Sequence, residues 1–153
     1  SPKGGPIPLD AGSLRGDFFT EESKKFLLDA DAMDMFSHSK KISDLATVDY
    51  DCLYVPGGHG CCGDFVSNAD VRGAIEGSYR AGKIVAVVCH APIALVECFK
   101  DEDGTKPLVE GLCVTGFSDA EEAAVGQTDN VPYLIETCFK EQGAKYEKAE
   151  SDW

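Results

Sequence analysis

Cys89 and His90 stand side by side between an apolar run at 84–88 and a segment that opens with Ala91-Pro92. The uninterrupted β-branched run predicts a strand buried on both faces, and proline in a first turn favours a helix that starts directly afterwards. A cysteine at such a strand-to-helix turn occupies the position of a nucleophile elbow, where the side chain is lifted above the sheet. Free N–H groups and the positive end of the helix dipole would stabilise its thiolate form. The sequence therefore predicts a reactive thiol at Cys89, with His90 as its acid or base.

Two plainer interpretations stay open on spacing alone. Cys89 could be a buried core thiol, because free cysteine packs like a small hydrophobic residue, and His90 could be a turn histidine whose ring is satisfied. The other six cysteines show no disulfide framework spacing, which indicates a reducing compartment, and we expect the cytosol. These six are Cys52, Cys61, Cys62, Cys98, Cys113 and Cys138.

A second candidate segment, Gly57-Gly58-His59-Gly60, follows the short β-prone run at 50–56. Glycine lets the backbone approach a ligand closely, so N–H groups of this loop could form half of an oxyanion hole. His59 with Cys61 and Cys62 could instead indicate a metal. We expect no metal, because the spacing lacks a Cys-x-x-Cys pair and a second ligand cluster.

Both segments lie where strands of the predicted sheet end. Strands are predicted at 50–56, 84–88, 112–115 and 145–147, and they alternate with helices predicted from Asn68, Ala91 and Pro132. This alternation predicts parallel pairing with helices on both faces, and functional groups then collect at the carboxyl ends of the strands. Residues 1–19 are predicted to be a loop, and Thr20 is predicted to cap a following helix.

Length and charge restrict the classes of function. The 153 residues carry 14 basic and 27 acidic side chains, for a net charge of −13. Nucleic acid and anionic lipid should repel such a surface, so neither is expected as a partner. No apolar run approaches the roughly 20 residues that a membrane-spanning helix needs.

Three ordered motifs resemble the ThiJ/PfpI superfamily, a class I glutamine amidotransferase-like group. They are Val-Pro-Gly-Gly-His-Gly at 55–60, Ala-Val-Val-Cys-His-Ala-Pro at 86–92, and Val-Thr-Gly-Phe-Ser-Asp-Ala-Glu-Glu at 114–122. The branch they are most similar to holds glyoxalase III enzymes and heat-shock chaperones. The resemblance implies a flavodoxin-like three-layer α/β/α sandwich with a mostly parallel sheet, and a homodimer.

The resemblance also implies roles for individual residues. Cys89 matches the nucleophile, His90 the histidine, and Glu122 the carboxylate that orients it, although neighbouring Glu121 could take that place and Glu122 could be a solvated acid at a helix start. Gly57, Gly58, His59 and Ala91 are expected to form the oxyanion and substrate-binding part of the site, where Ala91 replaces a glycine common in the family.

The chain departs from the family pattern at both ends. It has no counterpart of the first strand and helix, which carry a glutamate near the cysteine, or of the hairpin and helix that follow. We therefore expect residues 1–153 to be a single domain that is an internal portion of a longer chain, with the sandwich incomplete at both ends.

These features together predict an enzyme that converts a small 2-oxoaldehyde such as methylglyoxal to a 2-hydroxy acid, without glutathione, metal or any other cofactor. Two alternatives use the same elbow. One is a cysteine amidase or peptidase, and the other is a holdase chaperone or redox sensor without turnover, in which Cys89 oxidises to the sulfinate.

Overall fold

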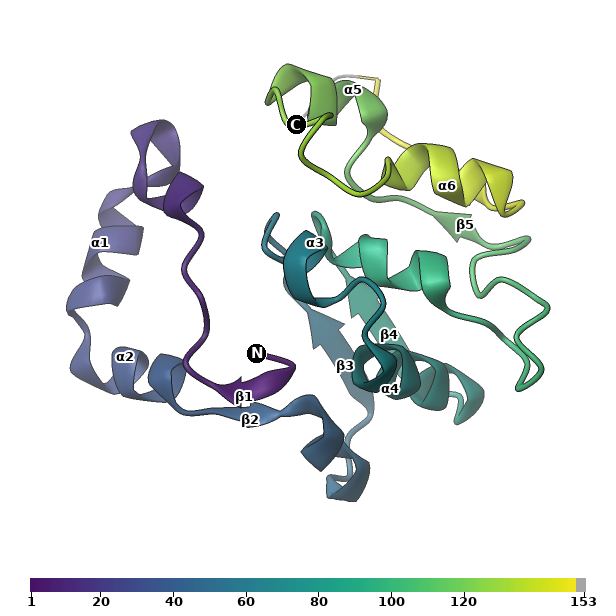
Figure 1. Ribbon diagram of the computed structural model, residues 1–153, viewed down its shortest axis with the longest axis horizontal. Helices are drawn as coiled ribbons and strands as arrows, with labels where there is room; N and C mark the ends of the chain where they lie inside the picture. Colours follow the sequence, from purple (N-terminus) through teal and green to yellow (C-terminus); the bar gives the residue numbers. More distant parts are fainter. Residues whose placement is uncertain (151–153) are drawn as a thin grey trace. The chain divides into compact units, whose positions relative to one another are not determined.

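The computed structural model describes residues 1–150 and divides the chain into two compact units, residues 1–49 and the part that begins at Tyr50 (Figure 1).

The first unit combines a short strand pair with two α-helices and three 3-10 helices. Antiparallel pairing joins its two strands, with Lys3 opposite Lys41. Its elements are β1 (Lys3–Gly5), η1 (Ala11–Leu14), η2 (Gly16–Phe18), α1 (Glu21–Leu28), α2 (Ala30–Ser37), β2 (Ser39–Lys41) and η3 (Ile42–Thr47).

Two expectations for this unit can be compared with the structure. Thr20 caps α1 as predicted, since its hydroxyl accepts a hydrogen bond from the Ser23 backbone N–H. The prediction that residues 1–19 form a loop is wrong in part, because β1 and two 3-10 helices lie there. The strand was missed because its pairing partner, β2, lies more than 30 residues further along the chain.

The second unit contains two pairs of parallel strands. Leu53 pairs with Val85 in the first, and Val114 with Tyr146 in the second. The elements are β3 (Cys52–Val55), α3 (Cys61–Asp64), α4 (Ala69–Arg80), β4 (Ile84–Val87), η4 (Ala91–Glu97), β5 (Cys113–Val114), α5 (Asp119–Ala124), α6 (Ile135–Glu141) and β6 (Lys145–Tyr146). The α/β class with parallel pairing is therefore confirmed, with strands that pair two by two among the described residues.

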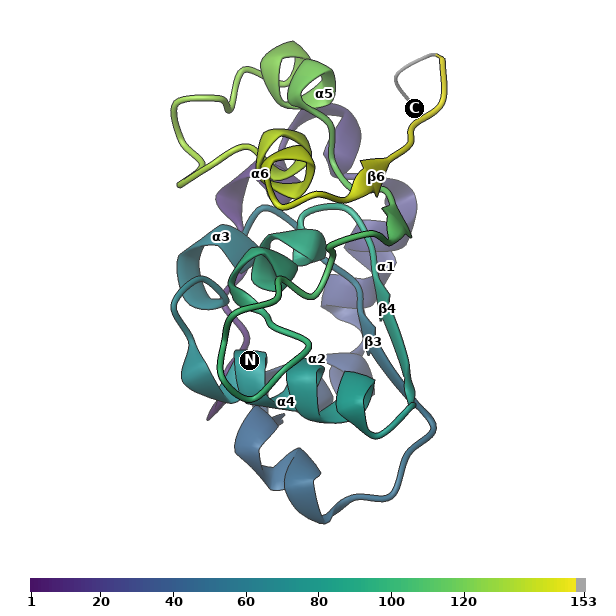
Figure 2. The ribbon, with the colours of Figure 1, turned by 90° about the vertical axis from the view of Figure 1, so that its right-hand side faces the viewer.

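Helices of the second unit pack against these strands and against one another (Figure 2). Asn68 caps α4 by accepting from the backbone N–H groups of Asp70 and Val71, and Gly82 follows the helix with a φ of +70°. Val71 and Ile75 of α4 are buried, as are Ile93 of η4 and Phe139 of α6. This core surrounds η4, the segment that follows Cys89 and His90.

Two details around β4 differ from expectation. A strand buried on both faces was predicted, but Ile84 is 63% exposed and Val88 44% exposed among the described residues. The reason is that β4 pairs with β3 alone and packs against α4. The helix after the elbow is also a 3-10 helix, which starts with a hydrogen bond from the Ile93 N–H to the His90 carbonyl.

The described residues include no helix of the length and apolar character that crossing a lipid bilayer requires.

Candidate active site

The predicted elbow is present at Cys89. Its φ is +62°, in the left-handed region that residues with a side chain rarely occupy. Two backbone hydrogen bonds hold the turn: the Ala91 N–H donates to the Val88 carbonyl at 3.1 Å, and the Phe117 N–H donates to the Cys89 carbonyl at 3.2 Å. The thiol is half-buried at this turn. The local strain is thus maintained by its surroundings, which is typical of a functional position.

The glycine loop lies directly against the elbow. Val88 donates its N–H to the Val55 carbonyl at 3.2 Å, so the two loops leave adjacent parallel strands together. At Gly57, where φ is +88°, a Cβ atom would lie 2.3 Å from the Val88 carbonyl oxygen and 3.0 Å from the Cys89 Cβ. Only glycine allows this approach, because both the backbone conformation and the available space exclude a side chain.

Cys89, His90 and Glu122 form a continuous series of polar contacts. The His90 Nε2 donates to the Glu122 Oε2 at 2.6 Å, and the Cys89 Sγ lies 3.6 Å from the His90 Nδ1. Because a carboxylate can only accept, the hydrogen of neutral His90 is on Nε2, and Nδ1 is left as an acceptor that faces the thiol. The His90 side chain is fully buried and Glu122 is 3% exposed. The arrangement can therefore take a proton from the thiol and stabilise the resulting imidazolium.

The structure distinguishes the two neighbouring glutamates. Ser118 caps α5, and Glu121 completes a capping box in which its carboxylate accepts the Ser118 backbone N–H at 2.7 Å. Glu121 is thereby directed back to the start of the helix. Glu122, one residue later, is directed toward His90.

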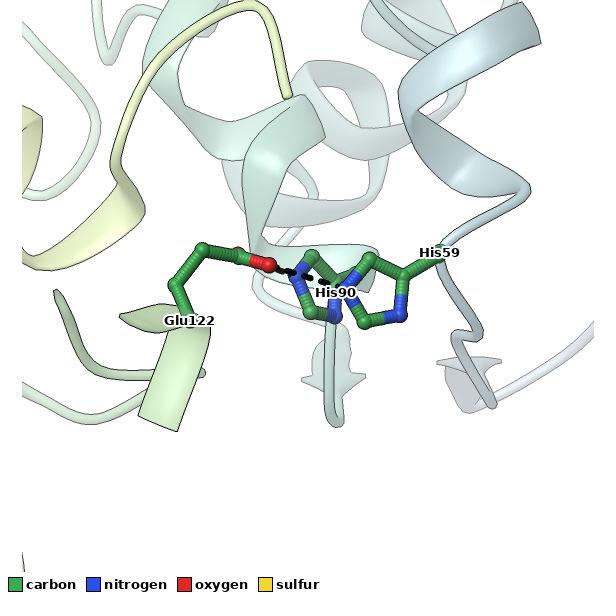
Figure 3. Close-up of side chains that lie close together, drawn as sticks. All are labelled: His59, His90 and Glu122. Carbon is green, nitrogen blue, oxygen red and sulfur yellow. Dashed lines mark hydrogen bonds and ion pairs between the residues drawn. The ribbon is translucent and has the colours of Figure 1, made fainter. Parts of the chain in front are cut away.

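His59 reaches the same carboxylate from the glycine loop (Figure 3). Its Nε2 donates to the Glu122 Oε1 at 2.9 Å, and its ring centroid lies 3.6 Å from that of His90. The Phe117 ring contacts both imidazoles, at centroid distances of 4.2 Å from His90 and 5.6 Å from His59. From the sequence, His59 was expected to belong to the oxyanion loop or, as the less favoured alternative with Cys61 and Cys62, to a metal site. This shared contact was missed, because 63 residues separate His59 from Glu122 and no spacing rule links them.

Burial dominates the ionisation of the groups around the site. It lowers the pKa of His90 from its ordinary value of 6.5, although the hydrogen bond that His90 donates to Glu122 opposes this change. Burial also raises the pKa of Cys61 to about 12 and that of Cys62 to about 11. Both of these α3 thiols therefore remain protonated near neutral pH and do not compete as nucleophiles.

The remaining predicted residues line the same turn. Neither the Gly58 nor the His90 backbone N–H donates a hydrogen bond to any residue within 1–150, so both are available to a ligand oxygen. Ala91 is fully buried and its N–H is used by the Val88 carbonyl. Ala91 thus stabilises the turn through this hydrogen bond, and its N–H is not free to bind an oxyanion.

His59, His90 and Glu122 are also the one set of three side chains, within the described part of the chain, with donor atoms close enough to hold a metal ion. Their candidate ligand atoms all lie within 4.8 Å of one another. Two imidazoles and a carboxylate suit zinc and related ions. Here both Nε2 atoms and both carboxylate oxygens are engaged in hydrogen bonds with each other, so a metal would have to displace both protons.

Comparison with known proteins agrees with this geometry. The model of the DJ-1/PfpI family matches residues 29–103. Glyoxalase 3 of Candida albicans is 30% identical over 97% of this chain and 65% of its own length, and the glutathione-independent glyoxalase HSP31 of Saccharomyces cerevisiae is 29% identical with the same two coverages. The chain thus spans about two thirds of the length of these curated relatives.

Solved structures give the same result. The rapid encystment protein of Francisella tularensis superposes with a TM-score of 0.80 at 33% identity, over 96% of this chain and 64% of that one. Glyoxalase III of Candida albicans superposes with a TM-score of 0.78 at 28% identity, over 97% and 64% of the two chains. The family model, the relatives and the shared fold agree: this chain is similar to proteins of the DJ-1/PfpI family.

Proposed function

We propose that this chain carries the reaction centre of a glutathione-independent glyoxalase, which converts a 2-oxoaldehyde such as methylglyoxal to a 2-hydroxy acid. The observation that carries the proposal is the series Cys89–His90–Glu122, at 3.6 and 2.6 Å, with a half-buried thiol at its outer end. The names of the two glyoxalase relatives support the same reaction class. A small carbonyl compound is the substrate class that follows from both.

The reaction begins with addition of the thiol to the aldehyde carbon. The His90 Nδ1 takes the thiol proton while the sulfur–carbon bond forms, and the former aldehyde oxygen is protonated to give a hemithioacetal. The N–H groups of Gly58 and His90 stabilise the charge that develops on that oxygen. Glu122 stabilises the imidazolium during this step, as the carboxylate of a catalytic triad does.

A proton shift and a hydrolysis complete the turnover. Neutral His90 removes the hydrogen of the former aldehyde carbon as a proton. The electron pair forms a double bond to the neighbouring carbon, whose carbonyl bond breaks and whose oxygen takes up that proton, which gives an enediol. Transfer of the hydroxyl proton of the former aldehyde carbon to the second carbon then gives a thioester, so one carbon is oxidised and the other reduced. Water then breaks the carbon–sulfur bond, which releases the 2-hydroxy acid and restores the thiol. No external oxidant, reductant or cofactor enters this balance.

Methylglyoxal consumption and lactate formation by the full-length protein test the proposal. We expect turnover in the wild type, none above background in Cys89→Ala, and unchanged turnover in Cys52→Ala, because Cys52 is an exposed thiol at the opposite end of β3. Activity that survives in Cys89→Ala would contradict the assignment. A fluorogenic peptide panel on the same samples distinguishes an amidase or peptidase, and the protection of an unfolding client distinguishes a holdase.

We further propose that the protein works in the cytosol as a homodimer. Seven free cysteines among the described residues suit a reducing compartment. Light scattering on the purified full-length protein checks the dimer.

A further inference from the structure

His59 and His90 share one carboxylate although they come from different strand ends. The His59 Nε2 uses Oε1 of Glu122 at 2.9 Å, and the His90 Nε2 uses Oε2 at 2.6 Å. The two imidazoles also contact each other in a tilted arrangement, with their planes 34° apart. His59 is about one third exposed, whereas the side chains of His90 and Glu122 are 0% and 4% exposed. Any change in His59 therefore reaches His90 both through the carboxylate and through the ring contact.

The sharing has an electrostatic consequence. A carboxylate that accepts a hydrogen bond from a second donor has less negative charge available for the first, so it stabilises an imidazolium less well. When the second imidazole is itself protonated, its like charge at this distance also disfavours a positive charge on the first, and both effects oppose the protonation of His90.

We propose that His59 is a positioning residue that keeps His90 in its neutral, Nε2-protonated form, with Nδ1 free to accept the proton of Cys89. This inference rests on the proposed function, in which His90 must act as a base toward the thiol. His59 acts on the reaction through Glu122 and is not itself required to touch the substrate.

The other titratable groups near His90 do not oppose its protonation. Glu122 and Glu121 of α5 both favour the charged form of His90, and so cannot hold it neutral. The raised pKa values of Cys61 and Cys62 keep these α3 thiols uncharged near neutral pH. Cys89 is the remaining titratable neighbour, and it lies at Nδ1, on the side of the ring away from the carboxylate. Besides burial, His59 is the group that opposes the two glutamates.

Histidine-selective NMR tests the proposal without relying on turnover. The chain has three histidines, so labelled histidine gives a spectrum that single variants can assign. His59→Phe keeps a ring against His90 but removes the donor, whereas His59→Gln keeps an N–H donor and removes the ring. His38→Phe is the matched control, because His38 also lies 3.1 Å from a carboxylate, that of Asp34, but in the first unit.

We expect the titration midpoint of His90 to rise by roughly 0.5–1 pH unit in His59→Phe, the size of effect that one neighbouring group produces. His59→Gln should raise it by less, because it keeps the donor to Glu122 and loses only the ring contact, and His38→Phe should leave it close to the wild-type value. An unchanged midpoint in His59→Phe, or equal shifts in His59→Phe and His59→Gln, would overturn the role of the donor. Methylglyoxal turnover on the same samples separates the two proposals: a shifted midpoint without turnover in the wild type would contradict only the proposed reaction.

Discussion

The chain contains two histidine–carboxylate pairs whose surroundings could hardly differ more. His38 and Asp34 lie on and next to α2 of the first unit, 3.1 Å apart, with side chains 75% and 74% exposed. His90 and Glu122 lie in the second unit, 2.6 Å apart, with side chains 0% and 4% exposed. Water screens the first pair, so it should contribute little, whereas the second pair has no competing solvent and orients a base toward a thiol. The presence of a histidine and a carboxylate therefore does not by itself define a candidate site. The second pair differs from the first because it is buried and because it has a third partner, the Cys89 thiol.

The same contrast extends to the two units. Pro2 is the one buried residue described in the first unit, in which the side chain of Thr47 is not described. In the second unit, Ile75, Ile93 and Phe139 are all at most 1% exposed. The candidate site belongs to the packed unit, where neighbouring side chains can hold a strained turn at Cys89.

Removal of the buried carboxylate should have the largest effect. Glu122→Gln keeps the shape of the side chain but loses the charge that orients and stabilises His90. We expect kcat/KM for methylglyoxal to fall on the order of ten-thousandfold, in line with the loss of a triad carboxylate. Asp34→Asn makes the equivalent change in the exposed pair and should leave turnover unchanged. An equal fall in kcat/KM for Glu122→Gln and Asp34→Asn would show that burial does not distinguish the two histidine–carboxylate pairs.

A methyl group at Gly57 should damage both stability and activity. In Gly57→Ala, the new Cβ would meet the Val88 carbonyl at 2.3 Å with φ at +88°, so the loop must move away from the elbow. The strained backbone alone should cost roughly 1–3 kcal/mol in the free energy of unfolding. Urea denaturation measures this cost. Gly60→Ala is the control, because its Cβ would meet nothing within 4 Å and its backbone is helical.

Loss of a helix cap should separate stability from function. Ser118 caps α5 and Thr20 caps α1, each by accepting a backbone N–H at 3.2 Å. Ser118→Ala and Thr20→Ala should each reduce the free energy of unfolding of their own unit by about 1 kcal/mol. Only Ser118→Ala should also slow turnover, because α5 positions Glu122. A comparable loss of turnover in Thr20→Ala would show that the first unit is coupled to the site.

The smallest expected effect concerns pH. Burial lowers the pKa of His90 in the folded protein below the 6.5 of an unfolded histidine, so the unfolded state binds more protons as the pH falls through this range. Stability from neutral His90 is therefore present above about pH 6.5 and is lost as the pH falls toward the folded pKa. Urea denaturation at pH 7.5 and pH 5.5 should show a larger loss for the wild type than for His90→Gln. A larger loss in the variant would contradict the direction of the shift.

Much of this site could be predicted from local sequence. The run 84–88 followed by Cys-His-Ala-Pro predicts the elbow, because strand propensity and the position of the proline both favour it. Glycine at position 57 likewise indicates a place where the backbone can approach a neighbour closely. The sequence also offered Glu121 and Glu122 as alternatives. It could not choose between them, because the choice depends on which glutamate completes the capping box with Ser118.

Long-range contacts account for what could not be predicted. The hydrogen bond between His59 and Glu122 joins two residues 63 positions apart, and the pairing of β1 with β2 joins Lys3 to Lys41. The exposure of Ile84 likewise depends on which elements cover β4, whereas a β-branched run indicates only that a strand forms. Patterns within a few residues therefore predicted the strands of the second unit and the elbow at Cys89, whereas the partners of His59 depend on the fold.

The most direct test of the central claim is to find the covalent intermediate on the thiol. Full-length protein mixed with methylglyoxal, quenched in acid and mapped by peptide mass spectrometry should carry the mass of one methylglyoxal on the peptide that contains Cys89. That adduct should form and decay at rates consistent with lactate production. Lactate formation at the wild-type rate with no adduct on that peptide, or with the adduct on another cysteine instead, would contradict the account.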